Sequence, residues 1–502
     1  MTSDLLWAVV FLQLLMGASD TLFHHEFSEK LAWQPSAQNE LKLHAIRNFI
    51  YSGLFLCFAW GVPHGLFALL AIGFILIEVV ITLWDFVEED LSRKLPPSER
   101  VLHTLLALNY GAILALLMPA LWGLFKLNTA YVPIYYGWGS WVLTFAGIGV
   151  FVFGVRDTLA ANRLSHLKRG PAGDLAKALK GHHHILITGA TGFIGKRLTA
   201  GLIENGHSVT VSTRNPQEAA RLGSPLNIIT SLDEIRDDAP VDAIINLAGE
   251  PLANGLWTKA KRERIVKSRL DLVAQIERLC ARLYVPPKTV IIASAIGWYG
   301  LRGDDELSEE SKAAPCFTHH VCQSLEQAAD RLKAYHCRVV NLRIGLVLGS
   351  EGGMLANLLV PFEYGLGGPI GSGKQWMSWI DLDDVIRLIV HALKTNDLEG
   401  PVNGVAPSPV RNQDFAKALG GVLNRPAILP VSATLLKLGL GDMAKELLLG
   451  SQRVVPEKAL SSGFVFQAST LSEALGKSLP FKPLTSRSTF AHNNIICPRN
   501  KL

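Results

Sequence analysis

The sequence predicts an α/β protein in which a doubly wound parallel sheet follows an all-α transmembrane helical bundle. Three observations predict this organisation. Apolar residues make up 49% of the 502 residues, and most of the excess lies before residue 156 in five runs. An apolar strand, a glycine-rich turn and an amphipathic segment then begin at His183. Beyond that point strand-like and helix-like segments alternate, which is typical of a parallel sheet with helices on both faces.

The N-terminal apolar runs predict about five membrane helices within residues 1–160. The second to fourth runs approach the ~20 residues that a helix needs to cross a bilayer. The first run is shorter and ends in Gly17-Ala18-Ser19, which resembles a signal-peptidase site, but no Lys or Arg precedes it. Since a signal peptide needs that positive region, we interpret the first run as a retained helix. The runs cover residues 5–18, 46–62, 65–84, 102–125 and 141–155.

Basic residues are distributed unequally between the two sides of these helices. The segments after runs one, three and five carry several Lys and Arg, whereas the opposite loops carry only Lys126. The apolar runs predict an integral membrane protein, in the inner or plasma membrane if it is bacterial. The positive-inside rule predicts that its N-terminus lies outside and its C-terminal part in the cytoplasm. Six cysteines without a CxxC pair agree with reduced thiols there. A net charge of +5 fits contact with membrane lipids and does not indicate nucleic-acid binding.

Carboxylates and histidines recur four residues apart near the predicted cytoplasmic ends of these helices. Residues at that spacing share a helix face, so the pairs are expected to converge. Such side chains bind iron, manganese or zinc, and a metal or quinone-type redox site is one interpretation. The other is that they cap helix ends and pair with neighbouring Lys and Arg. The pairs are Asp20 and His24, Glu40 and His44, Asp85 and Glu89, and Glu99 and His103, and the candidate metal ligands are His24, Glu40, His44, Asp85, Glu89 and His103.

The glycine-rich turn predicts a Rossmann-type dinucleotide site. Its spacing is G-x-x-G-x-x-G, between the strand ILIT and the helix KRLTAGLIENG. Glycines allow a tight turn and close approach of a pyrophosphate, whose charge is stabilised at the helix N-terminus. The candidate cofactor-binding residues in this turn are Gly189, Thr191, Gly192, Phe193, Ile194 and Gly195.

The end of the second strand predicts which cofactor binds. A carboxylate there binds the ribose 2′-hydroxyl of NAD. This sequence instead has Ser212-Thr213-Arg214-Asn215, without an acid and with a guanidinium suited to a phosphate. We therefore expect NADP rather than NAD.

The chain divides into five predicted segments. Residues 1–160 form the transmembrane domain, 161–182 a linker and 183–440 the NADP-binding domain, while 441–480 form a small C-terminal domain and 481–502 a loosely ordered tail. Further strands of the nucleotide domain are expected at NIIT, DAIINLAG, TVIIASA and RVVNLRIG.

Several motifs resemble the "epimerase family protein" subgroup of atypical short-chain dehydrogenase/reductases, within the NAD-dependent epimerase/dehydratase superfamily. They are ITGATGFIG, NLAGEPL, SRLD, SAIGWYG, RIGLVLGSEGGML, PFEYGLGGPIGSGKQWMSWIDLDD and NGVAPSPVRN. Residues 185 to about 478 carry the resemblance, and their last part resembles the domain of unknown function that accompanies the subgroup. The resemblance implies cofactor contacts for Thr213, Arg214, Leu247, Ala248 and Arg269. For Arg269, a salt bridge on a helix surface is an equal alternative.

The resemblance also implies where catalysis takes place. Dehydrogenases of this superfamily use a Tyr-x-x-x-Lys pair, in which the lysine lowers the tyrosine pKa. Here Cys322 and Glu326 occupy that spacing. A nearby carboxylate raises a thiol pKa, so Cys322 is expected to be a poor nucleophile. The candidate catalytic residues are therefore Tyr299, Ser294 and Glu326, although Tyr299 and Ser294 have structural interpretations as well.

Two functions remain open from the sequence. The first is a membrane-anchored NADP-dependent oxidoreductase that acts on a small lipophilic substrate or acceptor. The second is a non-catalytic NADP(H)-binding redox sensor that signals through the helices. Epimerisation of a nucleotide sugar is disfavoured by the Cys322/Glu326 pair and by the apolar anchor.

Overall fold

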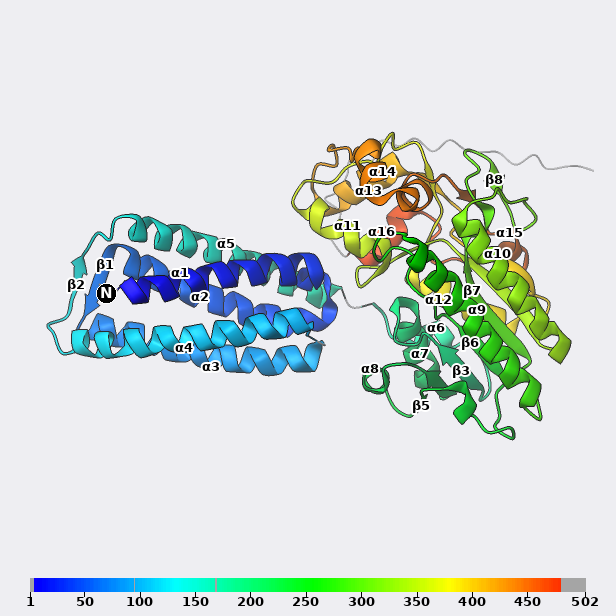
Figure 1. Ribbon diagram of the computed structural model, residues 1–502, viewed down its shortest axis with the longest axis horizontal. Coiled ribbons are helices and arrows are strands. Elements are labelled where there is room, and N and C mark those ends of the chain that lie inside the picture. The colour runs from blue at the N-terminus through cyan, green and yellow to red at the C-terminus, as the bar shows by residue number, and fades with distance from the viewer. Residues whose placement is uncertain (1–3, 94, 168, 480–502) are drawn as a thin grey trace, which may run out of the picture.

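The computed structural model of the protein describes residues 4–93, 95–167 and 169–479. An elongated bundle of helices stands beside a larger α/β part (Figure 1). The predicted α/β fold behind an N-terminal helical region is thus confirmed. The long helices of the bundle are α1 Asp4–Ser19, α2 Gln38–Trp60, α3 Leu66–Ser92, α4 Pro97–Phe125 and α5 Trp138–His166.

The bundle presents an apolar surface. Leu70, Phe74 and Trp84 of α3 are among many large apolar side chains that are exposed. Such a surface suits lipid rather than water. Within the described residues, four helical stretches are long and apolar enough to span a membrane by length and composition alone, and α2 is not among them. They are Asp4–Trp33, Leu66–Ser92, Pro97–Phe125 and Trp138–His166.

The two ends of the bundle are closed differently. At the end away from the α/β part, strands β1 Gly61–His64 and β2 Ala130–Pro133 pair in an antiparallel ribbon. At the other end, α1 continues into the π-helix η1 Asp20–Ser28, and the 3-10 turns η2 Leu31–Trp33 and η3 Pro35–Ala37 lead into α2. A π-helix pairs residues five apart, so it changes which side chains of η1 face inward.

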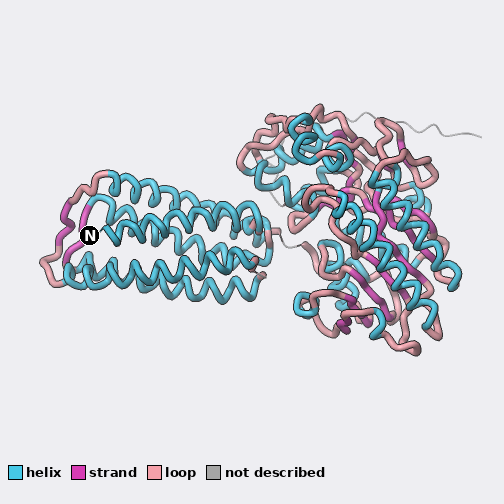
Figure 2. Tube along the Cα trace, in the orientation of Figure 1, coloured by secondary structure: helices cyan, strands magenta, loops and turns pink. Residues whose placement is uncertain are grey.

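The α/β part is built on a seven-stranded parallel sheet with the strand order β13-β9-β7-β6-β3-β4-β5. The order reverses between β3 and β6, and parallel sheets bind ligands at the carboxyl ends of the strands beside such a reversal. The strands are β3 His184–Thr188, β4 Ser208–Ser212, β5 Asn227–Ile229, β6 Ala243–Asn246, β7 Thr289–Ala295, β9 Arg338–Ile344 and β13 Gly400–Gly404. Figure 2 shows these strands gathered between helices.

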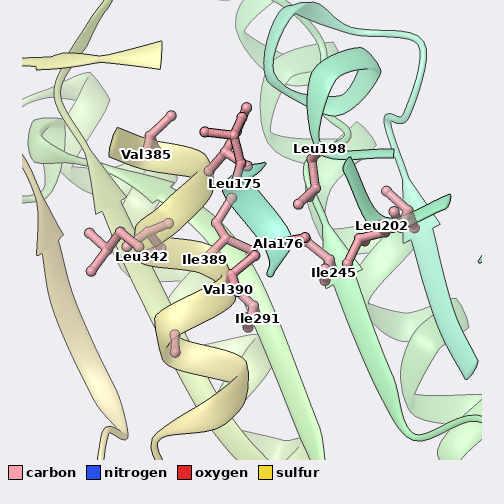
Figure 3. Packing of buried hydrophobic residues seen from close by; sticks show 14 of the residues in the cluster. Leu175, Ala176, Leu198, Leu202, Ile245, Ile291, Leu342, Val385, Ile389 and Val390 are labelled. Carbon is pink, nitrogen blue, oxygen red and sulfur yellow. The ribbon is translucent and has the colours of Figure 1, made fainter. Parts of the chain in front are cut away.

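Helices cover both faces of the sheet because its strands alternate their side chains. Ile187 of β3 belongs to the cluster under α6, α7 and α12, whereas its neighbour Leu186 belongs to the cluster under α9 and α10. Figure 3 shows the first cluster, in which Leu198, Ile245 and Ile389 are buried. The helices are α6 Gly173–Ala176, α7 Phe193–Glu204, α9 Lys259–Arg282, α10 Phe317–Asp330 and α12 Leu382–Lys394.

Shorter elements complete the α/β part. The remaining helices are α8 Pro216–Ala220, α11 Gly353–Glu363, α13 Asn412–Leu423, α14 Ala433–Leu440, α15 Glu457–Ser461 and α16 Leu471–Ser478. The remaining strands are β8 Glu306–Leu307, β10 Leu346–Leu348, β11 Trp376–Met377, β12 Trp379–Asp381, β14 Val410–Arg411 and β15 Arg453–Val454.

The linker predicted over residues 161–182 is largely structured. Helix α5 continues to His166, and Leu175, Ala176 and Leu179 lie in the core beside α7 and α12. The segment DLAKALK carries an apolar stripe that packs on this core, although Gly170-Pro171 before it is typical of a linker. The tail predicted over residues 481–502 lies outside the described residues.

Apolar and polar contacts join the bundle to the α/β part. Leu31 and Leu164 of the bundle share a buried cluster with Leu359 of α11. Glu363, at the end of α11, accepts hydrogen bonds from Trp33 Nε1 at 3.0 Å and Arg163 Nη1 at 2.9 Å. The bundle therefore rests on the helix that follows the carboxyl end of β10.

Replacing Ile389 with Ala tests the packing of α12 on the sheet. The Ile389 side chain is fully buried, so we expect the substitution to lower the unfolding free energy by about 2–5 kcal/mol. The measurement is a urea titration of the detergent-solubilised chain, read by proteolysis of the α/β part. Val465, 71% exposed, provides the control, because Val465→Ala is expected to change stability by less than about 0.5 kcal/mol. Equal effects of the two substitutions would contradict this packing.

Candidate functional site

The turn between β3 and α7 is held by close backbone contacts. Gly189 has a φ of +75°, which favours glycine, and a Cβ there would meet Ala248 N at 2.7 Å. A Cβ on Gly195 would lie 2.2 Å from Gly189 O. Thr191 and Gly192 complete the turn, and Phe193, Ile194 and Gly195 begin α7. The turn thus brings the N-terminus of α7 close to β6, in the arrangement that binds a pyrophosphate.

Phe193 has a second contact besides its place at the start of α7. Added Cβ atoms on Gly349 and Gly352 would lie 2.7 and 2.6 Å from its ring. The ring therefore packs on the loop that precedes α11. This loop therefore lies between the β3–α7 turn and α11, the helix that contacts the bundle.

The other candidate cofactor residues follow neighbouring strands at the same edge of the sheet. Thr213 and Arg214 come directly after β4, and Leu247 and Ala248 come directly after β6. A hydrogen bond from Leu247 N to Thr188 O at 3.0 Å ties the β6 loop to the end of β3. The structure thus assembles the predicted cofactor residues around one edge.

Arg214 is exposed and its guanidinium forms no hydrogen bond or ion pair within the part of the chain that the structure describes. Nearby, Glu250 binds Lys261 Nζ at 2.6 Å. That hydrogen bond is the main reason why the Glu250 pKa lies below its usual value, and the charge of Arg214 contributes less. The Arg214 guanidinium is therefore available for an anion.

Arg269 is not the surface salt bridge that the sequence left open. Its Nη1 donates to the backbone oxygens of Glu250 and Ile265, each at 3.0 Å. An added Cβ on Gly249 would lie 3.0 Å from its Cζ, so the guanidinium packs against the loop after β6. Burial lowers the Arg269 pKa. Its placement lets it face both this loop and the adjoining cavity.

A cavity of about 240 Å³ lies beside these loops, above the carboxyl ends of β7 and β9. Most of its lining is apolar and includes side chains from the C-terminal domain, such as Leu447 and Leu448. The polar lining residues are Arg269, Ser294, Thr318, Gln375, Ser378, Asn412, Glu446 and Gln452. An apolar pocket with a few polar groups is typical of a small-molecule site.

Ser294 is the one candidate catalytic residue that lines this cavity within the described chain. Its hydroxyl donates to Glu326 Oε1 at 2.6 Å. Glu326 is itself held by two hydrogen bonds from Arg343, at 3.0 and 2.8 Å. A carboxylate in a buried bidentate pair with arginine is fixed in place and positions its neighbours. Glu326 therefore orients the Ser294 hydroxyl from the side away from the cavity.

Tyr299 lies away from the cavity. Its side chain is fully buried, and its hydroxyl donates to Asn403 Oδ1 at 2.7 Å and accepts from Arg343 at 3.1 Å. Burial raises the Tyr299 pKa to about 12. This geometry supports Arg343 and does not bring Tyr299 to the cavity.

Cys322 and Ser294 both line the cavity, as expected of residues at the end of β7 and on α10. Burial, and then the charge of Glu326, raise the Cys322 pKa to about 11. The predicted direction is therefore confirmed, with burial as the larger cause. Cys322 remains a neutral thiol in the folded protein at physiological pH.

Sequence reasoning missed Arg343, which connects Glu326 with Tyr299. An arginine within the apolar strand RVVNLRIG was the signal, because a buried guanidinium requires a partner. The cavity residues Gln375, Asn412 and Gln452 were also missed. They come from loops far apart in the chain, and no spacing in the sequence places them together.

The bundle brings together part of the predicted metal set. Two compact groups of possible ligands form, and they share His25: Asp20, His25, Glu99 and His103 make one group, and His25, His44 and Glu89 make the other. His24 and Glu40 lie outside both groups, although His24 contacts Asp20. Asp85 accepts from Arg47 at 2.7 Å and also lies outside. Asp20 and His24 do share a face, as predicted for the i,i+4 pair, with a hydrogen bond of 2.9 Å. Segment η1 is a π-helix, however, and His25 rather than His24 joins the two groups of possible ligands.

Comparison with known proteins assigns the α/β part. Residues 185–403 match the model of the NAD dependent epimerase/dehydratase family, and residues 431–477 match a domain of unknown function. The predicted family resemblance is therefore confirmed. The bundle lies outside both matches.

Similar proteins span the same region. Epimerase family protein YfhF of Bacillus subtilis is 35% identical over 299 residues, which cover 59% of this chain and 97% of that protein. Human epimerase family protein SDR39U1 is 33% identical over 300 residues, which cover 58% and 98%. A crystal structure of human SDR39U1 isoform 2 with NADPH matches with a TM-score of 0.55 and 33% identity, covering 59% of this chain and 99% of the other. The family is thus shared over nearly the whole length of these relatives.

Alkylation of Cys322 tests its environment. With a pKa of about 11, the thiolate is about one molecule in a thousand at pH 8, against roughly a quarter for an ordinary thiol of pKa ~8.5. We expect iodoacetamide to modify Cys322 at least ~100-fold more slowly than glutathione, with a rate that rises about tenfold per pH unit from 8 to 10. Peptide mapping by mass spectrometry measures this rate. A plateau near pH 8.5 in the folded protein would contradict the geometry, and the denatured chain should show that plateau.

Proposed function

Because the chain belongs to the NAD dependent epimerase/dehydratase family, we propose that it is an NADP(H)-dependent oxidoreductase. We further propose that the N-terminal helices anchor it in a membrane, with the α/β part on the cytoplasmic side, and that it acts on a small lipophilic substrate or acceptor. The exposed guanidinium of Arg214 at the end of β4 carries this proposal.

The cofactor preference rests on charge at the adenosine end of the site. An acid at the end of the second strand would repel a 2′-phosphate, and this chain has Thr213 and Arg214 there. A planar guanidinium binds phosphate through paired N–H donors. NADPH bound to human SDR39U1, 33% identical, supports the same preference.

The residues of the proposed site would have separate roles in binding the cofactor and the substrate. The turn around Gly189 and Gly195 and the N-terminus of α7 would hold the pyrophosphate, and Arg269 would position the loop after β6. NADP(H), when bound, supplies or accepts a hydride. The Ser294 hydroxyl already donates to Glu326, so its lone pairs remain to accept a hydrogen bond from a substrate hydroxyl. This arrangement suits an alcohol substrate. For a carbonyl substrate, the Ser294 O–H would turn from Glu326 toward the carbonyl oxygen, and solvent would supply the proton that completes the alcohol.

The substrate class follows from the cavity and the anchor. Apolar side chains dominate the cavity lining, and Arg269 is its one lining arginine or lysine among the described residues. A nucleotide sugar carries two phosphates and many hydroxyls, which such a lining would leave unpaired. A lipophilic molecule delivered from the bilayer fits both the cavity and the apolar helices beside it.

A redox sensor without turnover is the second candidate function. Cys322 and Glu326 occupy the spacing of the proton-transferring pair, and Glu326 is engaged in a buried ion pair with Arg343. Phe193 also packs against the loop before α11, whose Glu363 contacts the bundle. A change in cofactor state at the turn would thereby reach the helices. Tight NADP(H) binding with no turnover on lipophilic acceptors would favour this second function.

Reversing the charge of Arg214 tests the cofactor preference. We expect Arg214→Asp to weaken NADPH binding by about 10- to 100-fold, since a charged hydrogen bond contributes roughly 1.5–3 kcal/mol, and to leave NADH binding unchanged or stronger. Isothermal titration of the full chain in detergent measures both. Arg236, exposed and paired with Asp238 at 2.7 Å, supplies the control Arg236→Asp, which should bind both cofactors normally. An unchanged NADPH affinity in Arg214→Asp would contradict the proposal.

Removing the Ser294 hydroxyl tests catalysis separately from binding. Membranes that contain the full chain are expected to oxidise NADPH with some member of a panel of quinones and lipophilic aldehydes or ketones. Ser294→Ala should lower that turnover by about 100-fold or more, with NADPH affinity unchanged. Tyr299→Phe is the comparison, because its hydroxyl lies away from the cavity. Turnover in Ser294→Ala equal to the wild type would exclude this role.

A further inference from the structure

The buried charges at the domain-facing end of the bundle are not used by the proposed oxidoreductase site. Side chains from η1, α2, α3 and α4 meet there, next to the contact with α11. Asp20, Glu89 and Glu99 are each no more than 5% exposed, and His25 and His44 are nearly as buried. Buried carboxylates in such a cluster require positive charge close to them.

Arginines compensate only some of these carboxylates. Arg93 binds both Glu40 and Glu99, at 2.9 and 2.6 Å, and Arg47 binds Asp85. Asp20 and Glu89 contact no lysine or arginine within the described residues. Their charged contacts are histidines: Asp20 meets His24, His25 and His103, and Glu89 meets His44 and His103. The cluster therefore lacks a positive charge that either protons or a metal ion must supply.

The spacing of one group matches the coordination sphere of an ion. Asp20 Oδ2 lies 3.0 Å from His103 Nε2 and 3.3 Å from His25 Nε2. Glu99 Oε1 lies 3.7 Å from the same His25 nitrogen and 4.0 Å from the same His103 nitrogen. Ligand atoms that sit 2.0–2.1 Å from a tetrahedral ion are about 3.3 Å apart. The four nitrogen–oxygen distances, 3.0 to 4.0 Å, are close to this ligand–ligand distance.

One ligand atom of this group and two atoms of the neighbouring group are buried without a hydrogen bond. His25 Nε2, His44 Nε2 and Glu89 Oε2 are buried and make no hydrogen bond of good geometry. The His25 ring stacks on His44 at 4.8 Å, which joins the two groups of possible ligands. Buried polar atoms left without a hydrogen bond indicate a missing partner.

We propose that Asp20, His25, Glu99 and His103 bind a divalent first-row transition-metal ion. Imidazole and carboxylate ligands suit iron, manganese or zinc. Arg93 holds Glu99 in place as an outer partner. Asp20, His25 and His103 also line a cavity of about 480 Å³ between the helices, so the ion is accessible from within the bundle. This site is independent of the NADP(H) proposal.

Cobalt binding tests the site, because Co²⁺ in a nitrogen and oxygen environment absorbs visible light and can replace the other ions. The full-length protein is purified in detergent, stripped with a chelator and titrated with Co²⁺. We expect saturation at about one ion per chain, with a visible band, and a higher thermal unfolding temperature in the loaded protein. Elemental analysis of the protein before stripping identifies the native ion.

Two neighbouring histidines provide a matched pair of variants. His103→Gln removes a ligand and should abolish the band. His24→Gln should keep it, because His24 bonds Asp20 and Ser98 from the side, outside the ligand group. His25→Gln gives a second test if His103→Gln folds poorly, and helical circular dichroism with NADPH binding monitors folding. No Co²⁺ binding in the wild type, or equal binding in His103→Gln, would overturn the proposal and leave protonated histidines as the compensating charge.

Discussion

The close approach of the β3–α7 turn to the loop after β6 is the constraint on which the nucleotide half depends. Gly195 and Gly189 leave no room for a side chain, because a Cβ on either would collide with backbone atoms. This contact places the N-terminus of α7, the loops after β4 and β6, and Arg269 around one edge of the sheet. A phosphate at that edge would have the N-terminus of α7 and the exposed guanidinium of Arg214 as binding partners.

A buried ion pair organises the side chains behind the cavity. Glu326 and Arg343 hold each other in a bidentate contact, with Ser294 on one side and Tyr299 on the other. The pair fixes the end of β7 relative to α10 and β9, and removing one partner would leave a buried charge uncompensated. Of the three candidate catalytic residues, only Ser294 lines the cavity within the described chain.

The sequence was most informative where backbone geometry determines the residue. The glycine turn, the alternating strands and the absence of an acid beside Arg214 predicted the fold and the cofactor edge. Long-range side-chain contacts could not be predicted in the same way. Tyr299 follows the fifth strand in the sequence, yet its hydroxyl turns toward Asn403, 104 positions later. In the bundle, an expected α-helical face placed His24 inward, whereas the π-helix places His25 there. Whether a segment forms an α-helix or a π-helix depends on its tertiary packing, and the periodicity of the sequence does not show that packing.

The account is tested most directly by the affinity of the unmodified full-length protein for NADPH and for NADH, measured by equilibrium dialysis in detergent at one ionic strength. The exposed Arg214 and the glycine turn predict saturable binding of NADPH, and affinity for NADH weaker by about tenfold or more, since one charged contact contributes roughly 1.5–3 kcal/mol. Binding of neither dinucleotide, or tighter binding of NADH, would contradict it.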